Sequence, residues 1–111
     1  MDGGQRNDFY ELLAKVRGLA EGACIEETNF LAVQVNVTGE NGGTFYIEVK
    51  DHKINVEPYE YNDRHCALTM DATNFNKLID GRLDPIFAFT TRKLKVDGDL
   101  GKALEFSQLL K

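Results

Sequence analysis

The residues best suited to catalysis or metal binding are two histidines, His52 and His65, and two cysteines, Cys24 and Cys66. A metal site needs several such ligands that converge on one point, and a catalytic thiol needs a base beside it. His65 and Cys66 are adjacent in a segment that alternates like a β-strand, so their side chains should point to opposite faces. We therefore predict no metal, no cofactor and no cysteine–histidine pair, and we expect two free thiols rather than a disulfide.

Three aspartates, Asp71, Asp84 and Asp99, are carboxylates that could be mistaken for a general acid or base. Each one directly precedes an apolar pattern of helical period. At that position a side-chain oxygen accepts hydrogen bonds from the free backbone N–H groups of the first helical turn. Capping therefore accounts for all three aspartates. The glycines form neither a GxGxxG fingerprint nor a P-loop, so nucleotide binding has no support.

Four basic residues, Arg82, Arg92, Lys93 and Lys95, form a small group late in the chain. Two interpretations remain open. The group can be the solvated face of a strand, or it can contact the carboxylate or phosphate head of a bound lipid. Arg82 and Arg92 are the candidate head-group contacts. Replacing both with alanine should weaken the binding of acidic lipids more than that of neutral ones.

Composition sets limits on partners and location. The chain has 111 residues, 42% of them hydrophobic, and a formal net charge of −5. This size fits one domain, which we place at residues 8–111 after a flexible leader at residues 1–7. The acidic balance disfavours nucleic acid and anionic membranes, and no apolar run reaches the ~18 residues that a stable membrane insertion needs. Without a signal segment or a Ser-Lys-Leu type of ending, the predicted location is cytoplasmic.

The elements that must position these residues follow from hydrophobic periodicity. Their order is α-β-β-β-β-α-α-β-α, which indicates an α+β fold with a meander of early strands and helices that share one face of the sheet. The first helix begins at Asp8, with Glu11 completing a capping box and Gly22 as the stop. Strands are predicted at residues 31–38, 45–50, 54–56, 66–70 and 94–96, turns at 41–43 and 97–98, and further helices after Asp71, Asp84 and Asp99.

The late helices carry more large apolar side chains than a narrow stripe can hold. In the last helix, Leu100, Ala103, Leu104 and Phe106 do not fit one stripe. Such a helix is either buried on several sides or borders a cavity. These side chains are thus core residues, or they line a pocket for an apolar molecule, and the absence of a catalytic constellation favours such a pocket over a reaction.

The late part of the chain also contains an ordered set of short pieces with characteristic spacing. The pieces are Leu68-Thr69-Met70, Phe75, Leu78, Gly81, Leu83-Asp84-Pro85, Ala88-Phe89, Lys93-Leu94-Lys95-Val96, Gly98, Leu100-Gly101, Ala103, Leu104 and Leu109. With the Gly-rich turn and aromatic at residues 37–46, this set resembles the sterol carrier protein family, of the type-two, nonspecific lipid-transfer kind. The resemblance covers roughly residues 9–111. The missing peroxisomal tripeptide favours a bacterial-like, stand-alone member.

The resemblance implies a five-stranded twisted, mainly antiparallel sheet covered on one face by helices. Between the two layers it implies an apolar tunnel for a fatty acid, a fatty acyl conjugate or a sterol-like molecule, and it implies no catalytic centre. Because bacteria mostly lack sterols, a fatty acid or acyl conjugate is the preferred ligand. By position, the residues expected to border the tunnel are Phe75, Leu78, Ile79, Leu83, Phe87, Phe89, Leu100, Ala103, Phe106 and Leu110.

The leading hypothesis is therefore a non-enzymatic lipid-binding and transfer domain, a monomer or weak homodimer that exchanges its ligand with a membrane donor or acceptor. Movement of residues 84–91 or of the C-terminal helix would open the tunnel. The alternative is a protein-interaction or dimerisation module of the same fold without a lipid. A third hypothesis is an accessory domain that presents a bound acyl substrate to a partner enzyme.

Overall fold

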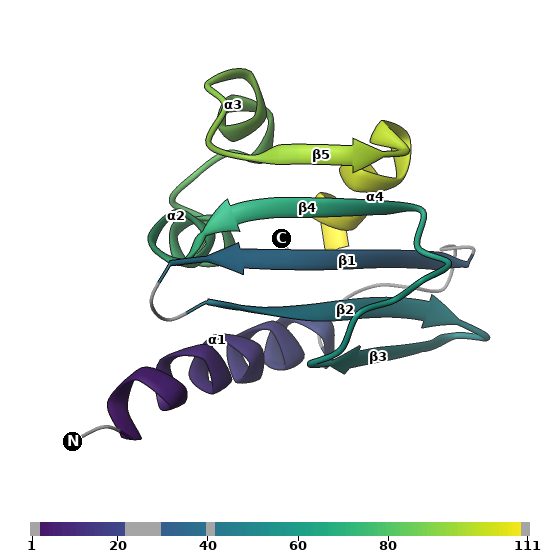
Figure 1. The fold of residues 1–111 in the computed structure, drawn as a ribbon. Helices are drawn as coiled ribbons and strands as arrows, with labels where there is room; N and C mark the ends of the chain where they lie inside the picture. Colours follow the sequence, from purple (N-terminus) through teal and green to yellow (C-terminus); the bar gives the residue numbers. More distant parts are fainter. Residues whose placement is uncertain (1–2, 22–29, 40–41, 110–111) are drawn as a thin grey trace.

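The helices and strands follow the predicted order in the computed structural model, which describes residues 3–21, 30–39 and 42–109. The strands form one five-stranded sheet, with α2 and α4 behind it in the view of Figure 1. The α+β class is confirmed. The elements are α1 (Gly3–Glu21), β1 (Leu31–Thr38), β2 (Gly43–Lys50), β3 (Lys53–Glu57), β4 (Cys66–Asp71), α2 (Ala72–Ile79), α3 (Pro85–Thr90), β5 (Lys95–Gly98) and α4 (Leu100–Leu109).

The strand order is β3-β2-β1-β4-β5, with β1 and β4 parallel and the other neighbours antiparallel. The sheet is thus mainly antiparallel, as predicted, but the simple meander is wrong, because β4 lies beside β1 and not beside β3. Burial explains the arrangement: Ala32 and Val33 of β1 are both 0% exposed, which suits a central strand. In β3 the side chains of Lys53 and Asn55 are exposed, as an edge strand tolerates.

The connection between β3 and β4, residues 58–65, crosses the outer face of the sheet (Figure 1). Polar side chains hold it there. The backbone N–H of Tyr61 donates to Gln34 Oε1 at 3.1 Å, and the Tyr61 hydroxyl donates to Glu48 Oε2 at 2.6 Å. The bond to Glu48, together with burial, raises the pKa of Tyr61 to about 12. This face is the polar one, so the apolar sides of the helices pack on the opposite face.

The core between the inner face and the first helix is closed around Phe45. Phe45 of β2 is 0% exposed, and its ring contacts Phe75 of α2 with 5.9 Å between ring centroids. Phe9 of α1 lies 6.5 Å from the same ring. Leu13 and Val16 follow on the buried side of α1 at the predicted helical spacing.

The first helix begins earlier than its sequence pattern predicts. It starts at Gly3 rather than Asp8, so the predicted helix start and the capping box with Glu11 are wrong. Once a helix has formed, each added residue gains one hydrogen bond without a new nucleation cost, so a polar segment can extend it. The predicted stop at Gly22 lies outside the described residues. The division into a leader and a domain stays a prediction.

The last strand is shifted by one residue and includes the predicted turn at Asp97 and Gly98. Gly98 adopts a φ of 111° and lies against the backbone of β4. An added Cβ there would stand 2.6 Å from the carbonyl oxygen of His65 and 2.9 Å from Cα of Cys66. The glycine therefore permits both a left-handed conformation and a close strand contact, and not a hairpin turn.

Candidate functional site

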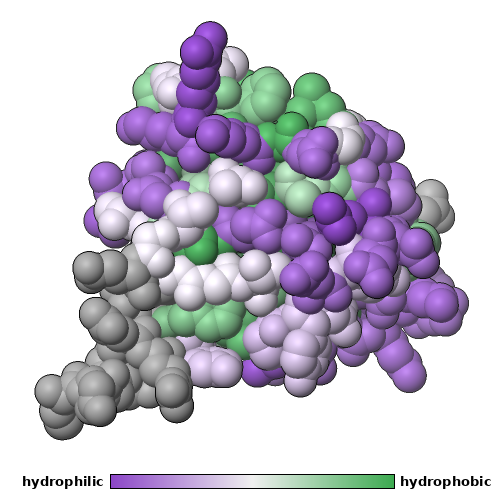
Figure 2. Space-filling view, viewed as in Figure 1, coloured by the Kyte–Doolittle hydropathy of each residue, from purple (hydrophilic) through white to green (hydrophobic). Residues whose placement is uncertain are grey.

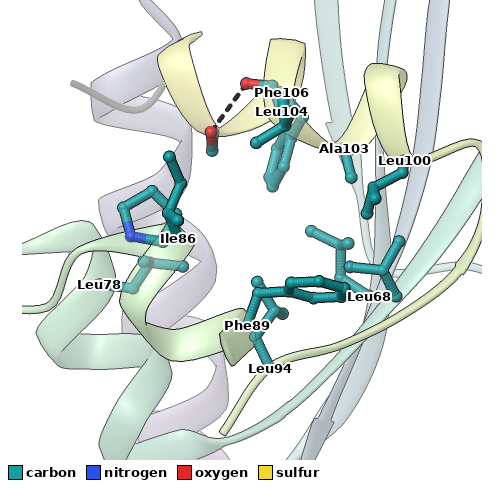
Figure 3. A pocket seen from close by; sticks show the side chains of 12 residues that line it. Leu68, Leu78, Ile86, Phe89, Leu94, Leu100, Ala103, Leu104 and Phe106 are labelled. Atoms are coloured by element: carbon teal, nitrogen blue, oxygen red, sulfur yellow. Dashed lines mark hydrogen bonds between the residues drawn. The ribbon is translucent and has the colours of Figure 1, made fainter. Parts of the chain in front are cut away.

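An apolar cavity of about 200 Å³ lies between the inner face of β4 and β5 and the helices α2, α3 and α4 (Figure 3). Its polar side chain among the described residues, Ser107, donates its hydroxyl to the carbonyl oxygen of Leu104 at 2.7 Å, so this hydroxyl is already paired within α4. The lining residues are Leu68, Leu78, Pro85, Ile86, Phe89, Leu94, Val96, Leu100, Ala103, Leu104, Phe106 and Ser107.

Helix α3 presents its side chains in three directions. The Asp84 carboxylate caps it by accepting from the backbone N–H of Phe87 at 2.9 Å, and Pro85 occupies the first turn, where a missing N–H costs little. Ile86 and Phe89, three residues apart, turn toward the cavity. Phe87 points elsewhere, is 53% exposed and lies beneath the Lys93 ammonium, 5.9 Å from its ring centroid.

The turn after α3 returns the chain to the cavity. Arg92 adopts a φ of 66°, which reverses the backbone. The N–H groups of Lys93 and Leu94 then both donate to the carbonyl oxygen of Ala88, at 2.8 and 3.0 Å. Ala88 itself is 0% exposed. The turn thereby fixes Leu94 in the cavity wall next to α3.

The opposite wall comes from α4, which the Asp99 carboxylate caps by accepting from the N–H of Lys102 at 3.1 Å. Ala103 and Phe106 are 6% and 1% exposed and close the inner part of the cavity. Leu100 and Leu104 are 46% and 45% exposed, and Ile86 and Phe89 of α3 are also exposed. In Figure 3 these four side chains converge on one space, so the gap between α3 and α4 is the mouth of the cavity.

A second hollow of about 680 Å³, here called the α2–α3 groove, adjoins this cavity and shares Leu78, Pro85 and Ser107 with it. The groove has a charged rim. Arg82 lies 3.6 Å from a carboxylate oxygen of Asp80, and Lys15 of α1 lies 3.0 Å from the other oxygen of that carboxylate. The groove therefore places charged groups next to the apolar cavity.

The structure divides the predicted site residues into four groups. The cavity wall contains Leu78, Phe89, Leu100, Ala103 and Phe106. The α2–α3 groove contains Ile79, Leu83 and Arg82. Leu110 lies outside the described residues, and Phe75, Phe87 and Arg92 line neither hollow.

Packing explains these last positions. Phe75 is 1% exposed because it fills the core against Phe45. Phe87 is one residue off the stripe that contains Ile86 and Phe89, so the helical twist turns it outward. Arg92 is used in the turn after α3, and its side chain is exposed.

Several wall residues were missing from the set of residues expected to border the tunnel, although Leu104 was among the side chains of the last helix that could line a pocket: Leu68, Pro85, Ile86, Leu94, Val96, Leu104 and Ser107. Helical spacing could have found Ile86 from Phe89 and Leu104 from Leu100. Strand alternation could have found Leu68 and Val96, which are register partners on adjacent strands. No sequence signal identifies Ser107 as a residue of the cavity wall.

Within the described residues the structure shows no cluster of three or more His, Cys, Asp or Glu that could hold a metal ion, and no helix long and apolar enough to cross a membrane. The Nδ1 atom of His65 accepts the backbone N–H of Ala32 at 3.0 Å, so it holds the connection to β4. Cys66 is 1% exposed, and burial raises the pKa of its thiol to about 11, which keeps it protonated and unreactive.

Comparison with known proteins supports one family. Residues 9–111 match the model of the SCP-2 sterol transfer family. The chain is 34% identical to hydroxysteroid dehydrogenase-like protein 2 of Homo sapiens over 77 aligned residues. The alignment covers 67% of this chain and 18% of that protein. The chain thus spans about a fifth of the length of such curated relatives.

Two solved structures from Aedes aegypti share the fold. Sterol carrier protein 2 like 2 superposes with a TM-score of 0.74 and 11% identity, over 93% of this chain and 96% of that one. Sterol carrier protein 2, solved in complex with the C16 fatty acid palmitate, superposes with a TM-score of 0.68 and 17% identity, over 93% and 94% of the two chains.

Proposed function

The chain belongs to the SCP-2 sterol transfer family, and from this membership and its cavity we propose that it binds the apolar tail of a fatty acid or fatty acyl conjugate and carries it without catalysing a reaction. The observation that carries the proposal is the cavity beneath α3 and α4, in which the Ser107 hydroxyl is already bonded to its own helix. Such a wall offers burial without directed polar contacts, which suits a methylene chain. The palmitate complex of the Aedes aegypti sterol carrier protein supports the same ligand class.

Cavity size indicates how the ligand would fit. Each buried methylene gains about 0.8 kcal/mol, and apolar cavities of ~150 Å³ already bind a benzene ring. The cavity of about 200 Å³ is smaller than the ~300–1,000 Å³ typical of ligand pockets. It therefore accepts one segment of an acyl chain, and the remainder extends through the mouth or into the α2–α3 groove, or α3 and α4 separate to admit it.

A head-group contact completes the proposal. Arg82 stands at the groove, and its distance of 3.6 Å from Asp80 is long for a charge-assisted hydrogen bond. A ligand carboxylate at the groove can replace this partner. Arg92, in the turn at the other end of α3, would meet only a head group that leaves through the mouth. Arg82→Ala should therefore weaken acidic ligands more than Arg92→Ala, with a fatty alcohol of equal length as the neutral control.

Exchange of the ligand requires α3 or α4 to move. Helix α3 has six residues, and the side chains of Ile86 and Phe89 that it places over the mouth are 59% and 41% exposed. Few buried contacts therefore hold it, which lowers the free energy of local opening. We expect α3 to be the first segment to open when a ligand enters.

A matched pair on α3 tests the proposed site. Phe89→Asp places a charge at the cavity wall and should abolish binding of a fluorescent fatty acid, whereas Phe87→Asp places the same charge on the outer side and should leave the Kd within about twofold. Circular dichroism of both variants checks the fold. Equal affinities of the two folded variants for the fatty acid would refute the assignment of the cavity.

A second candidate function rests on the length of the relatives. Because the chain matches about a fifth of a dehydrogenase-like protein, it is also suited to present a bound acyl substrate to chemistry done on another domain or partner. Native mass spectrometry of the purified chain separates the proposals. Lipid bound at equal stoichiometry favours the carrier, a bare dimer favours an interaction module, and ligand transfer only to an added enzyme favours the accessory role.

A further inference from the structure

Helix α3 exposes an unusual amount of apolar surface, both at the mouth of the cavity and on its outer side. Ile86, Phe87 and Phe89 are 59%, 53% and 41% exposed, although they are consecutive or nearly so on a six-residue helix. Figure 2 shows hydrophobic side chains gathered at the top of the molecule, where Figure 1 places α3, with hydrophilic ones beside them. An apolar cluster of this kind indicates an interaction surface.

The charge around this cluster is positive. Between Pro85 and Val96 the sequence contains Arg92, Lys93 and Lys95 and no acidic residue. All three are exposed, and none of them takes part in an ion pair within the described residues. Lys93 lies over the ring of Phe87, which joins the basic and apolar parts. We call Ile86, Phe87, Phe89, Arg92 and Lys93 the α3 surface.

The net charge of −5 does not cancel this local charge. The molecule extends 43 Å along its longest axis, whereas exposed charges are screened beyond about 10 Å at 0.1 M salt. Asp84 and Asp97 flank the segment in sequence, and the Asp84 carboxylate is bonded to the N–H of Phe87. An anionic partner that touches only the α3 surface therefore meets a positive potential.

We propose that the α3 surface docks on the anionic face of a lipid bilayer, so that the mouth of the cavity opens toward the membrane. The inference rests on the proposed function, since a carrier must collect its ligand from a membrane. Basic side chains would contact lipid phosphates, while Phe87 and Ile86 enter the boundary between head groups and acyl chains. Because Ile86 and Phe89 also border the mouth, an acyl chain could pass from bilayer to cavity along apolar side chains without crossing water.

Vesicle sedimentation with the full chain tests this docking. We expect binding to vesicles of phosphatidylcholine and phosphatidylglycerol, weak binding to pure phosphatidylcholine, and release by salt. The double variant Arg92→Glu/Lys93→Glu and the single variant Phe87→Asp should each lower the partition coefficient by about tenfold or more. The matched control is Lys50→Glu/Lys53→Glu, which changes the net charge equally at the β2–β3 turn, far from α3 in Figure 1, and should leave binding within about twofold.

Binding of a fluorescent fatty acid in the absence of vesicles separates this proposal from the proposed function. Fatty acid binding that survives in Phe87→Asp, a residue outside the cavity wall, while vesicle binding is lost supports docking by the α3 surface. Vesicle binding that depends on this surface in a chain that binds no fatty acid would support docking and reject the carrier. Equal loss in the β2–β3 control, or unchanged vesicle binding in both α3 variants, would overturn the proposal. So would a stable dimer in sedimentation equilibrium that the α3 variants dissociate without changing vesicle binding, because the surface would then serve a second copy.

Discussion

Phe45 and Phe89 have the same side chain but lie in two regions of the molecule that are packed differently. Phe45 belongs to the α1 side, formed by α1, α2 and β1–β3, where its ring is 0% exposed and contacts Phe9 and Phe75. Phe89 belongs to the α3–α4 end, formed by α3, β5 and α4, where it is 41% exposed beside a cavity. A rich supply of apolar side chains is common to both regions, so it does not by itself mark a site.

The two regions pack differently because their helices and strands differ in length. On the α1 side a helix of 19 residues packs against a sheet whose strands β1 and β2 have eight residues each, so long apolar faces meet across the two layers. At the α3–α4 end a six-residue helix and a four-residue strand meet a helix of ten, and they cannot cover one another completely. Apolar surface without a facing layer is what distinguishes a binding region from a core.

The largest expected contrast is in stability. Phe45→Ala should lower the free energy of unfolding by about 3–5 kcal/mol, because it leaves a cavity in closed packing. Phe89→Ala should lower it by about 1 kcal/mol, because its ring is already partly solvated and borders empty space. Urea unfolding of both variants measures the two values. Similar losses would show that the α3–α4 end is as tightly packed as the α1 side.

A cavity-filling substitution sharpens the comparison at the ligand site. Ala103→Leu adds side-chain volume inside the cavity, so it should weaken fatty acid binding by about tenfold or more, or 1.4 kcal/mol, while changing stability by less than about 1 kcal/mol. The matched control is Ala20→Leu near the end of α1, outside the cavity wall, which should leave the Kd unchanged. Titration of a fluorescent fatty acid provides the measurement. A retained affinity in Ala103→Leu would place the ligand elsewhere.

Sequence analysis could predict much of this architecture because local patterns determine it. Asp71, Asp84 and Asp99 cap helices as their positions predict. Strand pairing was harder to predict: the alternation at residues 66–70 identifies β4, but nothing in it distinguishes β3 from β1 as its neighbour. The connection at residues 58–65 decides the pairing through contacts such as Tyr61 with Gln34, which join residues distant in sequence.

The candidate site was less predictable than the fold for a related reason. A cavity is defined by what fails to pack, and that depends on several elements at once. Phe75 and Phe87 have the same residue type as Phe89, yet one is closed by Phe45 and the other turns outward on α3. Helical phase could have separated Phe87 from Ile86 and Phe89. Only the assembled layers show that Phe75 is sealed.

The capping aspartates give a smaller contrast. Asp71→Ala removes the bond to the N–H of Asn74 in a helix packed on the α1 side, so it should lower global stability by about 1 kcal/mol. Asp84→Ala removes the bond to the N–H of Phe87 in α3 and should mainly increase local opening. Amide hydrogen exchange would show this as faster exchange confined to α3 and the turn after it, at Phe87, whose cap is lost, and at Ala88, Thr91, Lys93 and Leu94, whose N–H groups bond to Asp84, Phe87 and Ala88. Exchange that rises across the whole chain in Asp84→Ala would contradict a separately opening α3.

The smallest expected effect concerns the polar face, where Tyr61 donates to Glu48. Tyr61 in the folded chain has its pKa raised from 10.0 to about 12, so above pH 10 the phenol ionises more readily in the unfolded chain than in the folded one. The stabilisation is therefore complete below pH 10 and is lost as the pH rises toward about 12. Tyr61→Phe should cost less than about 1 kcal/mol at neutral pH, since Glu48 keeps its bond from Asn55, and it should remove this part of the alkaline destabilisation.

Urea unfolding on either side of pH 10, together with an absorbance titration of the tyrosines, tests this expectation. Fatty acid binding provides the comparison with the α3–α4 end, because the bond of Tyr61 lies on the outer face of the sheet and the cavity on the inner face. Tyr61→Phe should therefore leave the Kd unchanged. A variant that lost ligand affinity but kept its stability would show that the polar face and the cavity are coupled, and the two regions would then have to be treated as one cooperative unit.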